Sequence, residues 1–301
     1  TDLLYQMEAE AEEGEDFSEI IDEIKSRFTE IIEGLGLKDF SLDDQFDEIW
    51  KRMKDDPDAD YAASRGEHLN GRIMAEYLGF EFVDPFEMVF FDEEGILDDR
   101  KTMRAVEKRL SEVEYAVIPG FYGCSHEGKV KPFSRGGSDV TGSIVAGACH
   151  ADVYENWTDV SGFLVADPRI IKNPARIETI TYRELRELSY MGASVLHEEA
   201  IFPVRRQGIP INIRNTNRPE DEGTWIVEST AQKSGYVITG IAGRKDFCAV
   251  LIYKDMMNSE IGFGRKVLQA FEDNEISFEH MPSGIDTMTI VVHEDEFIEK
   301  E

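Results

Sequence analysis

Between a strand-like run and a helix-like run of small residues, the chain carries Phe133-Ser134-Arg135-Gly136-Gly137-Ser138-Asp139-Val140-Thr141-Gly142. The apolar run 115–123 before it is typical of a buried strand, and the run 143–151 after it is typical of a helix. Glycines let a backbone come close to a ligand, and the first turn of a helix offers unpaired N–H groups to an anion. The order of strand, glycine-rich loop and helix therefore predicts an anion-binding site at the carboxyl end of a strand.

Two charged residues in this stretch refine the prediction. Arg135 offers a planar guanidinium that can hold a carboxylate or phosphate through two hydrogen bonds, and Asp139 places one negative charge at the helix start. Taken singly, these residues are explained as well by an ordinary N-cap at Ser138 and Asp139. Together, after a buried strand, they favour anion binding.

Strand-like and helix-like runs alternate from residue 115 onward. We expect strands over 115–122, 153–158 and 210–213, and helices over 138–151, 181–190 and a short segment through 195–197. This alternation is typical of an α/β fold in which a mostly parallel sheet carries helices on both faces. Ligands of such folds gather where the strands end at their carboxyl side.

The upstream part of the chain is predicted to be mainly helical. An acidic segment at 8–16 is expected to be a solvated helix lead-in or loop, and Ser41 with Asp44 resembles a capping box. Apolar spacing predicts helices over 17–35, after Ser41, over 62–78 and over 101–114, with short strands at 80–83 and 88–91.

A polar, turn-rich break at 217–235 separates a second module. Its predicted elements are a strand at 247–253, a helix at 264–274 and strands at 276–281 and 287–293. This β-α-β-β order is most of a ferredoxin-like α+β unit. We therefore expect one domain over 1–230 and an incomplete second domain over 236–301.

Composition limits the classes of function. The 301 residues include 62 Asp and Glu against 32 Lys and Arg, a net charge of −30. So acidic a surface repels nucleic acid and anionic membranes, so a bound anion needs a local positive patch. Three widely spaced cysteines predict reduced thiols in a cytoplasmic protein. No apolar run approaches the length that spans a membrane, and no residues show the spacing of a metal site.

Other motifs carry weaker signals. The run 123–130 resembles a phosphate-binding P-loop, but Val130 lacks the required hydroxyl and no helix follows, so we expect a loop without function and an exposed Lys129. His68 is most simply a solvent-exposed residue.

Two motifs follow a predicted strand: Trp157-Thr158-Asp159-Val160 lies at the strand end, and Asp167-Pro168-Arg169 comes a few residues later. This pair of motifs fits either a nucleotide site or a capped turn with a solvated arginine.

In combination, these motifs resemble aspartate kinase, within the amino-acid kinase superfamily. The matching stretches are Ser64-Arg65-Gly66-Glu67, the stretch 133–141, Trp157-Thr158-Asp159-Val160, Asp167-Pro168-Arg169, the stretch 191–197 and Ile209-Pro210-Ile211. The tail from Thr239 resembles the family's first ACT domain. The resemblance covers nearly the whole chain, in the family's order.

The resemblance implies an αβα-sandwich kinase that uses ATP and Mg²⁺ to phosphorylate the side-chain carboxylate of L-aspartate. It further implies a lysine or threonine effector and a homodimer formed through ACT modules. By position, Glu67 would hold the substrate amino group, Arg135 its α-carboxylate, and Asp139 would orient catalytic lysines. The remaining implied site residues are Gly136, Gly137 and Ser138 for substrate, Thr158, Asp159, Leu164, Arg169, Ser194 and Val195 for nucleotide, and Ser277, Met281, Ser283 and Gly284 for effector.

The chain also departs from the family pattern. It lacks the opening strand with the Lys-Phe-Gly-Gly-Ser phosphate loop and the second ACT domain, so it resembles a piece truncated at both ends and little turnover is expected of it. Ser194 stands where the family often has lysine, which puts one nucleotide contact in doubt. The alternatives are another amino-acid kinase acting on an acyl or carbamoyl substrate, and a non-catalytic amino-acid sensor.

Overall fold

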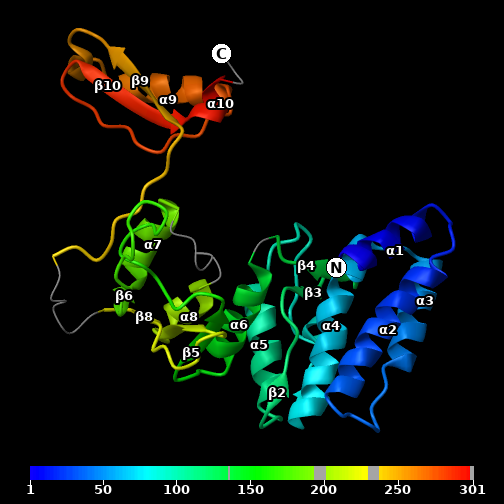
Figure 1. Ribbon diagram of the computed structural model, residues 1–301. Helices are drawn as coiled ribbons and strands as arrows, with labels where there is room; N and C mark the ends of the chain where they lie inside the picture. The colour runs from blue at the N-terminus through cyan, green and yellow to red at the C-terminus, as the bar shows by residue number, and fades with distance from the viewer. Residues whose placement is uncertain (135, 193–200, 230–236, 299–301) are drawn as a thin grey trace. The chain divides into compact units, whose positions relative to one another are not determined.

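The computed structural model describes residues 1–134, 136–192, 201–229 and 237–298. The chain divides into two compact units, Thr1–Ile241 and Ala242–Glu301 (Figure 1). Arg135, Ser194, Val195 and the predicted helical segment through 195–197 lie outside the described residues. Among the described residues, no helix is both long enough and apolar enough to cross a membrane.

The first unit opens with four helices that enclose their own apolar core. They are α1 (Asp2–Glu12), α2 (Ser18–Gly34), α3 (Asp43–Asp55) and α4 (Ala59–Leu78). Residues at helical spacing, such as Ile24, Phe46 and Leu69, meet in this core, which confirms the predicted amphipathic helices.

Two local predictions for this region had different outcomes. The acidic segment at 8–16 is mostly the end of helix α1. The predicted capping box of Ser41 with Asp44 is wrong, because the Ser41 hydroxyl accepts from the Asp43 N–H and α3 begins at Asp43.

A second group of elements follows in the same unit. It comprises β1 (Glu81–Phe82), η1 (Pro85–Glu87), α5 (Asp99–Leu110), β2 (Ala116–Val117), β3 (Tyr122–Cys124), β4 (Val130–Pro132) and α6 (Gly137–Ala148). The predicted strand 115–122 is split, because Phe121 takes a φ of 68° between β2, which pairs with β1, and β3, which forms a hairpin with β4. The predicted strand 88–91 is replaced by two isolated bridges, from Phe90 to Cys124 and from Phe91 to Leu97. No helix follows the 123–130 loop, as expected.

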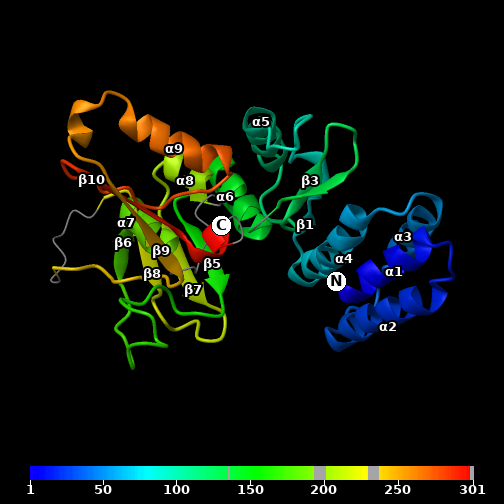
Figure 2. The same ribbon diagram turned by 90° about the horizontal axis from the view of Figure 1, so that it is seen from above.

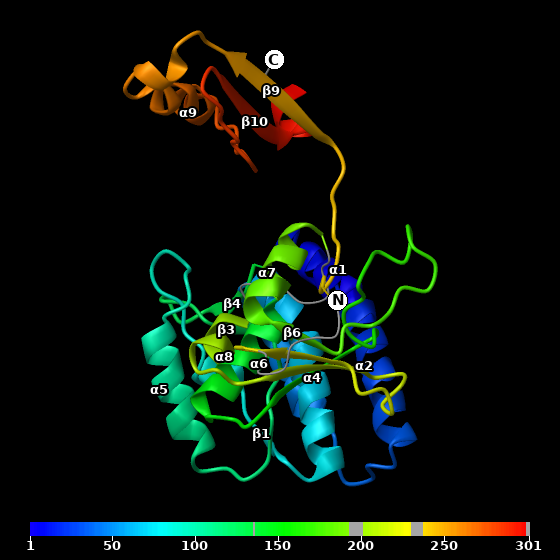
Figure 3. The same ribbon diagram turned by 90° about the vertical axis from the view of Figure 1, so that its left-hand side faces the viewer.

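A four-stranded sheet with two described helices completes the first unit (Figure 2 and Figure 3). Its elements are β5 (Tyr154–Thr158), β6 (Thr179–Thr181), α7 (Tyr182–Tyr190), α8 (Phe202–Arg206), β7 (Ile211–Asn215) and β8 (Thr224–Val227). The order is β5-β7-β8-β6, with parallel β5–β7 and β6–β8 pairs and an antiparallel β7–β8 pair. Strand β8 lies inside the break that the sequence predicted to be turn-rich, and residues of α6, α7 and α8 pack with the strands in one core.

The second unit has a simpler order than predicted. Its elements are β9 (Phe247–Tyr253), η3 (Met257–Ser259), α9 (Phe263–Asp273), β10 (Thr287–His293) and α10 (Glu294–Ile298). Strands β9 and β10 pair antiparallel along their whole length, from Thr287 opposite Tyr253 to His293 opposite Phe247. The predicted strand 276–281 is wrong, since only His280 makes an isolated bridge, to Val291.

Candidate functional site

The start of α6 lies directly against the chain segment that follows β2. A Cβ atom on Gly137 would lie 2.7 Å from the Phe121 Cα, and a Cβ on Gly120 would lie 2.9 Å from the Ser138 Cα. Real side chains do not tolerate such distances, so both positions require glycine. The segment and the first turn of α6 are therefore in backbone contact.

Hydrogen bonds fix this junction. The Phe121 N–H donates to the Thr141 hydroxyl (3.1 Å), which itself donates to the Gly137 carbonyl (2.8 Å). Phe121 holds a left-handed conformation that is costly for a bulky residue, a kind of strain that is found disproportionately at functional sites. Gly136, with a φ of 56°, precedes α6, whose first N–H groups have no partner within the helix. Anion binding at this helix start is consistent with that arrangement.

Strand β5 holds the carboxylate of Asp139. The Asn156 side-chain amide donates to Asp139 Oδ1 at 2.8 Å, and the Tyr154 hydroxyl donates to the Asp139 carbonyl at 3.4 Å. Burial, together with the nearby Asp139 charge, raises the pKa of Tyr154 to about 12, so this hydroxyl keeps its proton at neutral pH. Asn156 is buried, with 9% exposure. Asn156 was not predicted as a site residue, because an amide within a strand carries no sequence signal of its hydrogen-bond partner.

Glu67 lies on the face of α4 that adjoins the same junction. Its side chain is exposed, and Gly71, one turn later, packs so closely on Pro119 that an added Cβ would lie 2.9 Å from the ring. Since residues four apart share a helix face, Glu67 lies on the face of α4 that carries Gly71. Ser138 of α6 packs against Gly120 in the same segment as Pro119. Gly136, Gly137, Ser138 and Asp139 are consecutive at the start of α6, and the participation of Glu67 in the same site stays a prediction.

The carboxyl ends of β5 and β7 form a polar edge beside these residues. The Thr158 carbonyl accepts hydrogen bonds from the Thr216 N–H (2.8 Å) and hydroxyl (2.9 Å), and Asp159 is exposed. Behind them, buried Asn215 donates to Ser161 (2.9 Å), which donates to Asp221 (2.6 Å). The sequence indicated Thr158 and Asp159, but it gave no signal for this supporting cluster.

Leu164 and Arg169 occupy the long loop after β5. Leu164 is paired with Arg176 through a bridge and is 38% exposed. The Arg169 guanidinium binds the Asp167 carboxylate through Nε at 3.0 Å and Nη2 at 2.6 Å, which lowers the pKa of Asp167. Among the described residues, Arg169 makes no hydrogen bond or ion pair with Thr158 or Asp159. The loop therefore has a capped turn, and the arginine side chain is 85% exposed.

The predicted effector residues lie on the segment between α9 and β10. The Ser277 N–H donates to Glu296 (3.0 Å), the Gly284 N–H donates to the Thr287 carbonyl (2.7 Å), and Ser283 makes a bridge to Met288. Met281 packs against the core of the second unit. These contacts define the segment's course, and its binding role stays a prediction.

Comparison with known proteins places the chain in a family. Residues 9–215 match the sequence pattern described as the amino acid kinase family. This chain belongs to that family. Aspartokinase 3 of Bacillus subtilis is 43% identical to this amino acid kinase over 243 residues, which are 78% of the chain and 53% of the relative. Chloroplastic aspartokinase 1 of Arabidopsis thaliana is 32% identical over 232 residues, 72% of the chain and 41% of the relative.

Solved structures of aspartate kinases are also similar to this chain. The aspartate kinase of Clostridium acetobutylicum is 50% identical with a TM-score of 0.86, covering 98% of this chain and 67% of that one. Aspartokinase III of Escherichia coli, solved with aspartate and ADP, is 23% identical with a TM-score of 0.67 over 97% of this chain and 70% of that one, and shows the fold alone. This amino acid kinase thus spans about half the length of its curated relatives.

The family match confirms the predicted α/β fold class for this amino acid kinase. One expectation about a single residue is wrong: His68 is 4% exposed, since its α4 face packs against Phe82 and Tyr122. Lys129 is exposed, as expected, and the three cysteines are free. Within the described ranges, no three His, Cys, Asp or Glu side chains come together as metal ligands.

Proposed function

We propose that the protein is an aspartate kinase. It transfers the γ-phosphoryl group of ATP to the side-chain carboxylate of L-aspartate and forms 4-phospho-L-aspartate, the first step of lysine, threonine and methionine biosynthesis in the cytoplasm. The observation that carries this proposal is the start of α6 held against residues 120–121, with Asp139 fixed by Asn156. Relatives named aspartokinase or aspartate kinase at 43% and 50% identity support it.

The chemistry suits these residues. An ionised carboxylate is already a nucleophile, so the site has only to align the reactants and neutralise charge on the transferring group. Glu67 holds the substrate ammonium group, and Arg135 forms a bidentate pair with its α-carboxylate. The N–H groups of Gly136, Gly137 and Ser138 stabilise negative charge at the helix start, and Asp139 orients a catalytic lysine.

The nucleotide lies at the carboxyl ends of β5 and β7 in this proposal. Thr158 and Asp159 contact its ribose and phosphates, and the exposed Arg169 turns from Asp167 to reach a phosphate. Leu164, Ser194 and Val195 complete this site. Magnesium, bound through the ATP phosphates, neutralises charge on the transferring oxygens.

The second unit is proposed to be an ACT regulatory domain. Lysine or threonine would bind along Ser277, Met281, Ser283 and Gly284. Pairing of this unit with a second copy would give a homodimer.

The proposal is tested with the protein expressed from its complete gene. Coupled detection of ADP should show turnover that requires both aspartate and Mg-ATP. ADP formation that does not depend on aspartate would exclude this function. Binding of lysine or threonine without any turnover would favour a non-catalytic sensor.

The contribution of Arg135 is testable in the same assay. Arg135→Ala removes a charge-assisted pair worth about 1.5–3 kcal/mol, so the KM for aspartate should rise about tenfold or more while the KM for ATP changes little. Arg27→Ala, at an exposed position on α2, is the matched control. An unchanged KM for aspartate would remove Arg135 from the substrate site.

A further inference from the structure

An open pocket of about 440 Å³ lies on the side of α4 that Glu67 does not face. Residues of α3, α4, η1 and the β3–β4 turn line it, and we call it the α3–α4 pocket. Arg65 lies in this pocket, two positions before Glu67 and so roughly 200° around the helix from it. The pocket is therefore separate from the proposed aspartate site.

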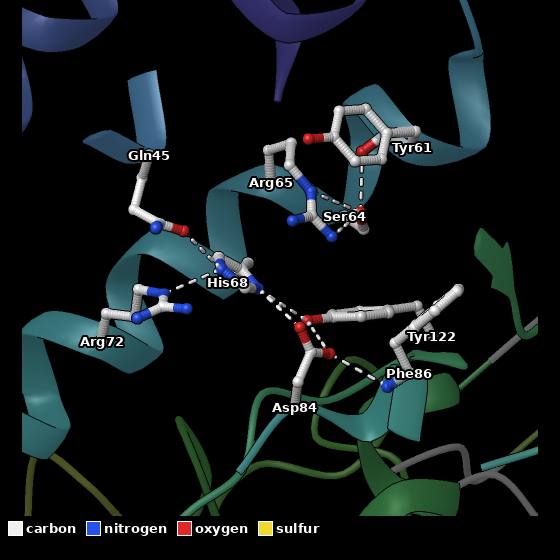
Figure 4. A network of polar contacts seen from close by, with 9 residues as sticks. All are labelled: Gln45, Tyr61, Ser64, Arg65, His68, Arg72, Asp84, Phe86 and Tyr122. Atoms are coloured by element: carbon white, nitrogen blue, oxygen red, sulfur yellow. Dashed lines mark hydrogen bonds and ion pairs between the residues drawn. The ribbon is translucent and has the colours of Figure 1, made fainter. Parts of the chain in front are cut away.

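Arg65 is a buried cation without a carboxylate partner. It is 6% exposed, and its Nε and Nη2 donate to the Ser64 hydroxyl at 3.0 and 2.9 Å. The guanidinium lies 4.3 Å from the ring centroid of Tyr61. Among the described residues no carboxylate pairs with it, and Figure 4 shows its other terminal nitrogen on the side away from Ser64. A buried charge without a counter-ion is costly, so an anion in the pocket would stabilise it.

Arg72 adds a second guanidinium on the same helix face. Its Nε donates to His68 Nε2 at 2.9 Å, and the other ring nitrogen of His68 lies 3.1 Å from the Asp84 carboxylate. Burial, with the charges of Arg65 and Arg72, holds the pKa of His68 below its ordinary value, so the ring is neutral and accepts from Arg72. Arg72 lines the pocket, and within the described ranges its two terminal nitrogens form no hydrogen bond or ion pair.

Asp84 is the nearest carboxylate, but its oxygens are already engaged. They accept from His68, from the Tyr122 hydroxyl (3.0 Å) and from the Phe86 N–H (2.9 Å), as Figure 4 shows. Burial raises the pKa of Asp84, but these hydrogen bonds and the Arg65 charge outweigh burial and lower it. Asp84 is thus an ionised group that orients His68, and among the described residues it forms no ion pair with Arg65 or Arg72.

The rest of the lining is also positive on balance. Five cationic side chains line the α3–α4 pocket, namely Lys51, Arg52, Arg65, Arg72 and Lys129, against the three carboxylates of Glu48, Asp55 and Asp84. Asp56, outside the lining, pairs with both Arg52 (3.1 Å) and Lys129 (3.3 Å), so the cations still outnumber the carboxylates, five to four. Arg52 has a buried Nε that finds no hydrogen-bond partner among the described residues. In a chain of net charge −30, such a local surplus is the condition for holding an anion.

We propose that the α3–α4 pocket binds a small oxyanion, a phosphate group or a dicarboxylate, between Arg65 and Arg72. Planar guanidinium forks match both ligands, because each presents pairs of oxygens. Lys51 adds charge without a fixed geometry, whereas Lys129 is held by Asp56 at 3.3 Å. The site is independent of the proposed kinase activity.

Calorimetric titration with potassium phosphate and with sodium succinate tests this proposal. The titrations use protein carrying Arg135→Ala, so that the proposed substrate anchor does not contribute. One of the two anions should bind, and Arg65→Gln or Arg72→Gln in the same background should weaken that binding at least tenfold. Arg27→Gln, an exposed change on α2, should leave it unaltered.

The results of these titrations identify the class of anion and show whether the proposed site exists. Tighter binding of phosphate indicates a phosphorylated ligand, and tighter binding of succinate indicates a dicarboxylate. If Arg65→Gln does not fold, Arg72→Gln, at a half-buried position, decides the matter. The proposal is overturned if neither anion binds, or if binding persists unchanged in Arg72→Gln.

Discussion

At the scale of single residues, the candidate site depends on side chains that hold other side chains. Asp139 is recognisable from its place at a helix start, whereas Asn156, which fixes it, carries no signal in the sequence. The same holds for His68, which the pattern of α4 suggested to be exposed. Its burial depends on Phe82 and Tyr122, residues 14 and 54 positions later, so no local pattern could predict it.

A substitution of Asn156 tests whether its hydrogen bond to Asp139 matters for activity. Asn156→Leu keeps the volume of the side chain but removes the donor to Asp139, which costs about 1–3 kcal/mol of orientation at a buried site. We expect kcat to fall about fivefold to a hundredfold, with little change in the KM for aspartate, in steady-state assays. Asp152→Asn, an exposed change before β5, should leave kcat unaltered. A loss confined to KM would mean that Asn156 serves binding rather than Asp139.

His68 should make stability depend on pH. Its pKa is lowered in the folded state from 6.5, so below pH 6.5 the unfolded chain binds a proton that the folded chain does not. This contribution is fully present above pH 6.5 and is lost as pH falls toward the folded pKa, by at most about 1.4 kcal/mol per pH unit. Urea unfolding between pH 7 and 5 should therefore show a shallower fall for His68→Gln than for wild type.

The control for His68→Gln is the same substitution at a solvent-exposed histidine. His126→Gln is suitable, because the His126 side chain is 61% exposed, and this variant should retain the wild-type dependence on pH. Equal slopes for wild type and His68→Gln would show that His68 does not titrate differently on folding.

At the scale of elements, helices and strands could be predicted where the apolar pattern was regular and the element was long. Helices α2, α4 and α6 were predictable because their apolar residues repeat with the helical period over three turns or more. Strands β6 and β8 have 3 and 4 residues, too few for an alternating pattern to emerge from the surrounding turns. The strand over 115–122 was overextended, because the turn at Phe121 is stabilised by Thr141, which is distant in sequence.

The contact between the 118–121 segment and α6 is the element-level feature that shapes the site. Gly120→Ala would place a methyl group 2.9 Å from the Ser138 Cα, so the segment must move away from the helix start. We expect unfolding free energy to fall by about 1–3 kcal/mol, as for other overpacking changes, and activity to fall with it. Chemical denaturation and the ADP assay measure both.

A second glycine gives the control for this change. Gly34→Ala adds a methyl group at the end of α2, where nothing lies within 4 Å, and should be neutral or slightly stabilising. A Gly120→Ala protein as stable and active as Gly34→Ala would show that the close contact is not needed.

At the scale of the whole molecule, the two units have separate cores. The first holds three apolar clusters, and the second holds one, built around Met288, Ile290 and Val292. The sequence indicated the break by composition, but β8 inside that break shows that polar, turn-rich segments also occur within a domain. Because each unit buries its own apolar residues, each can respond to its own ligand.

Calorimetry of the intact protein should resolve that response. We expect two unfolding transitions, with L-aspartate raising the temperature of the one assigned to Thr1–Ile241 and lysine or threonine raising that of Ala242–Glu301. A ligand at a hundredfold excess over its Kd stabilises the unit that binds it by about 2.7 kcal/mol, a readily measured shift. D-lysine and D-threonine serve as controls, since a specific site distinguishes enantiomers. If neither L-amino acid shifts the second transition, the effector site proposed along Ser277–Gly284 is wrong, whereas aspartate binding to the first unit would stand or fall on its own transition.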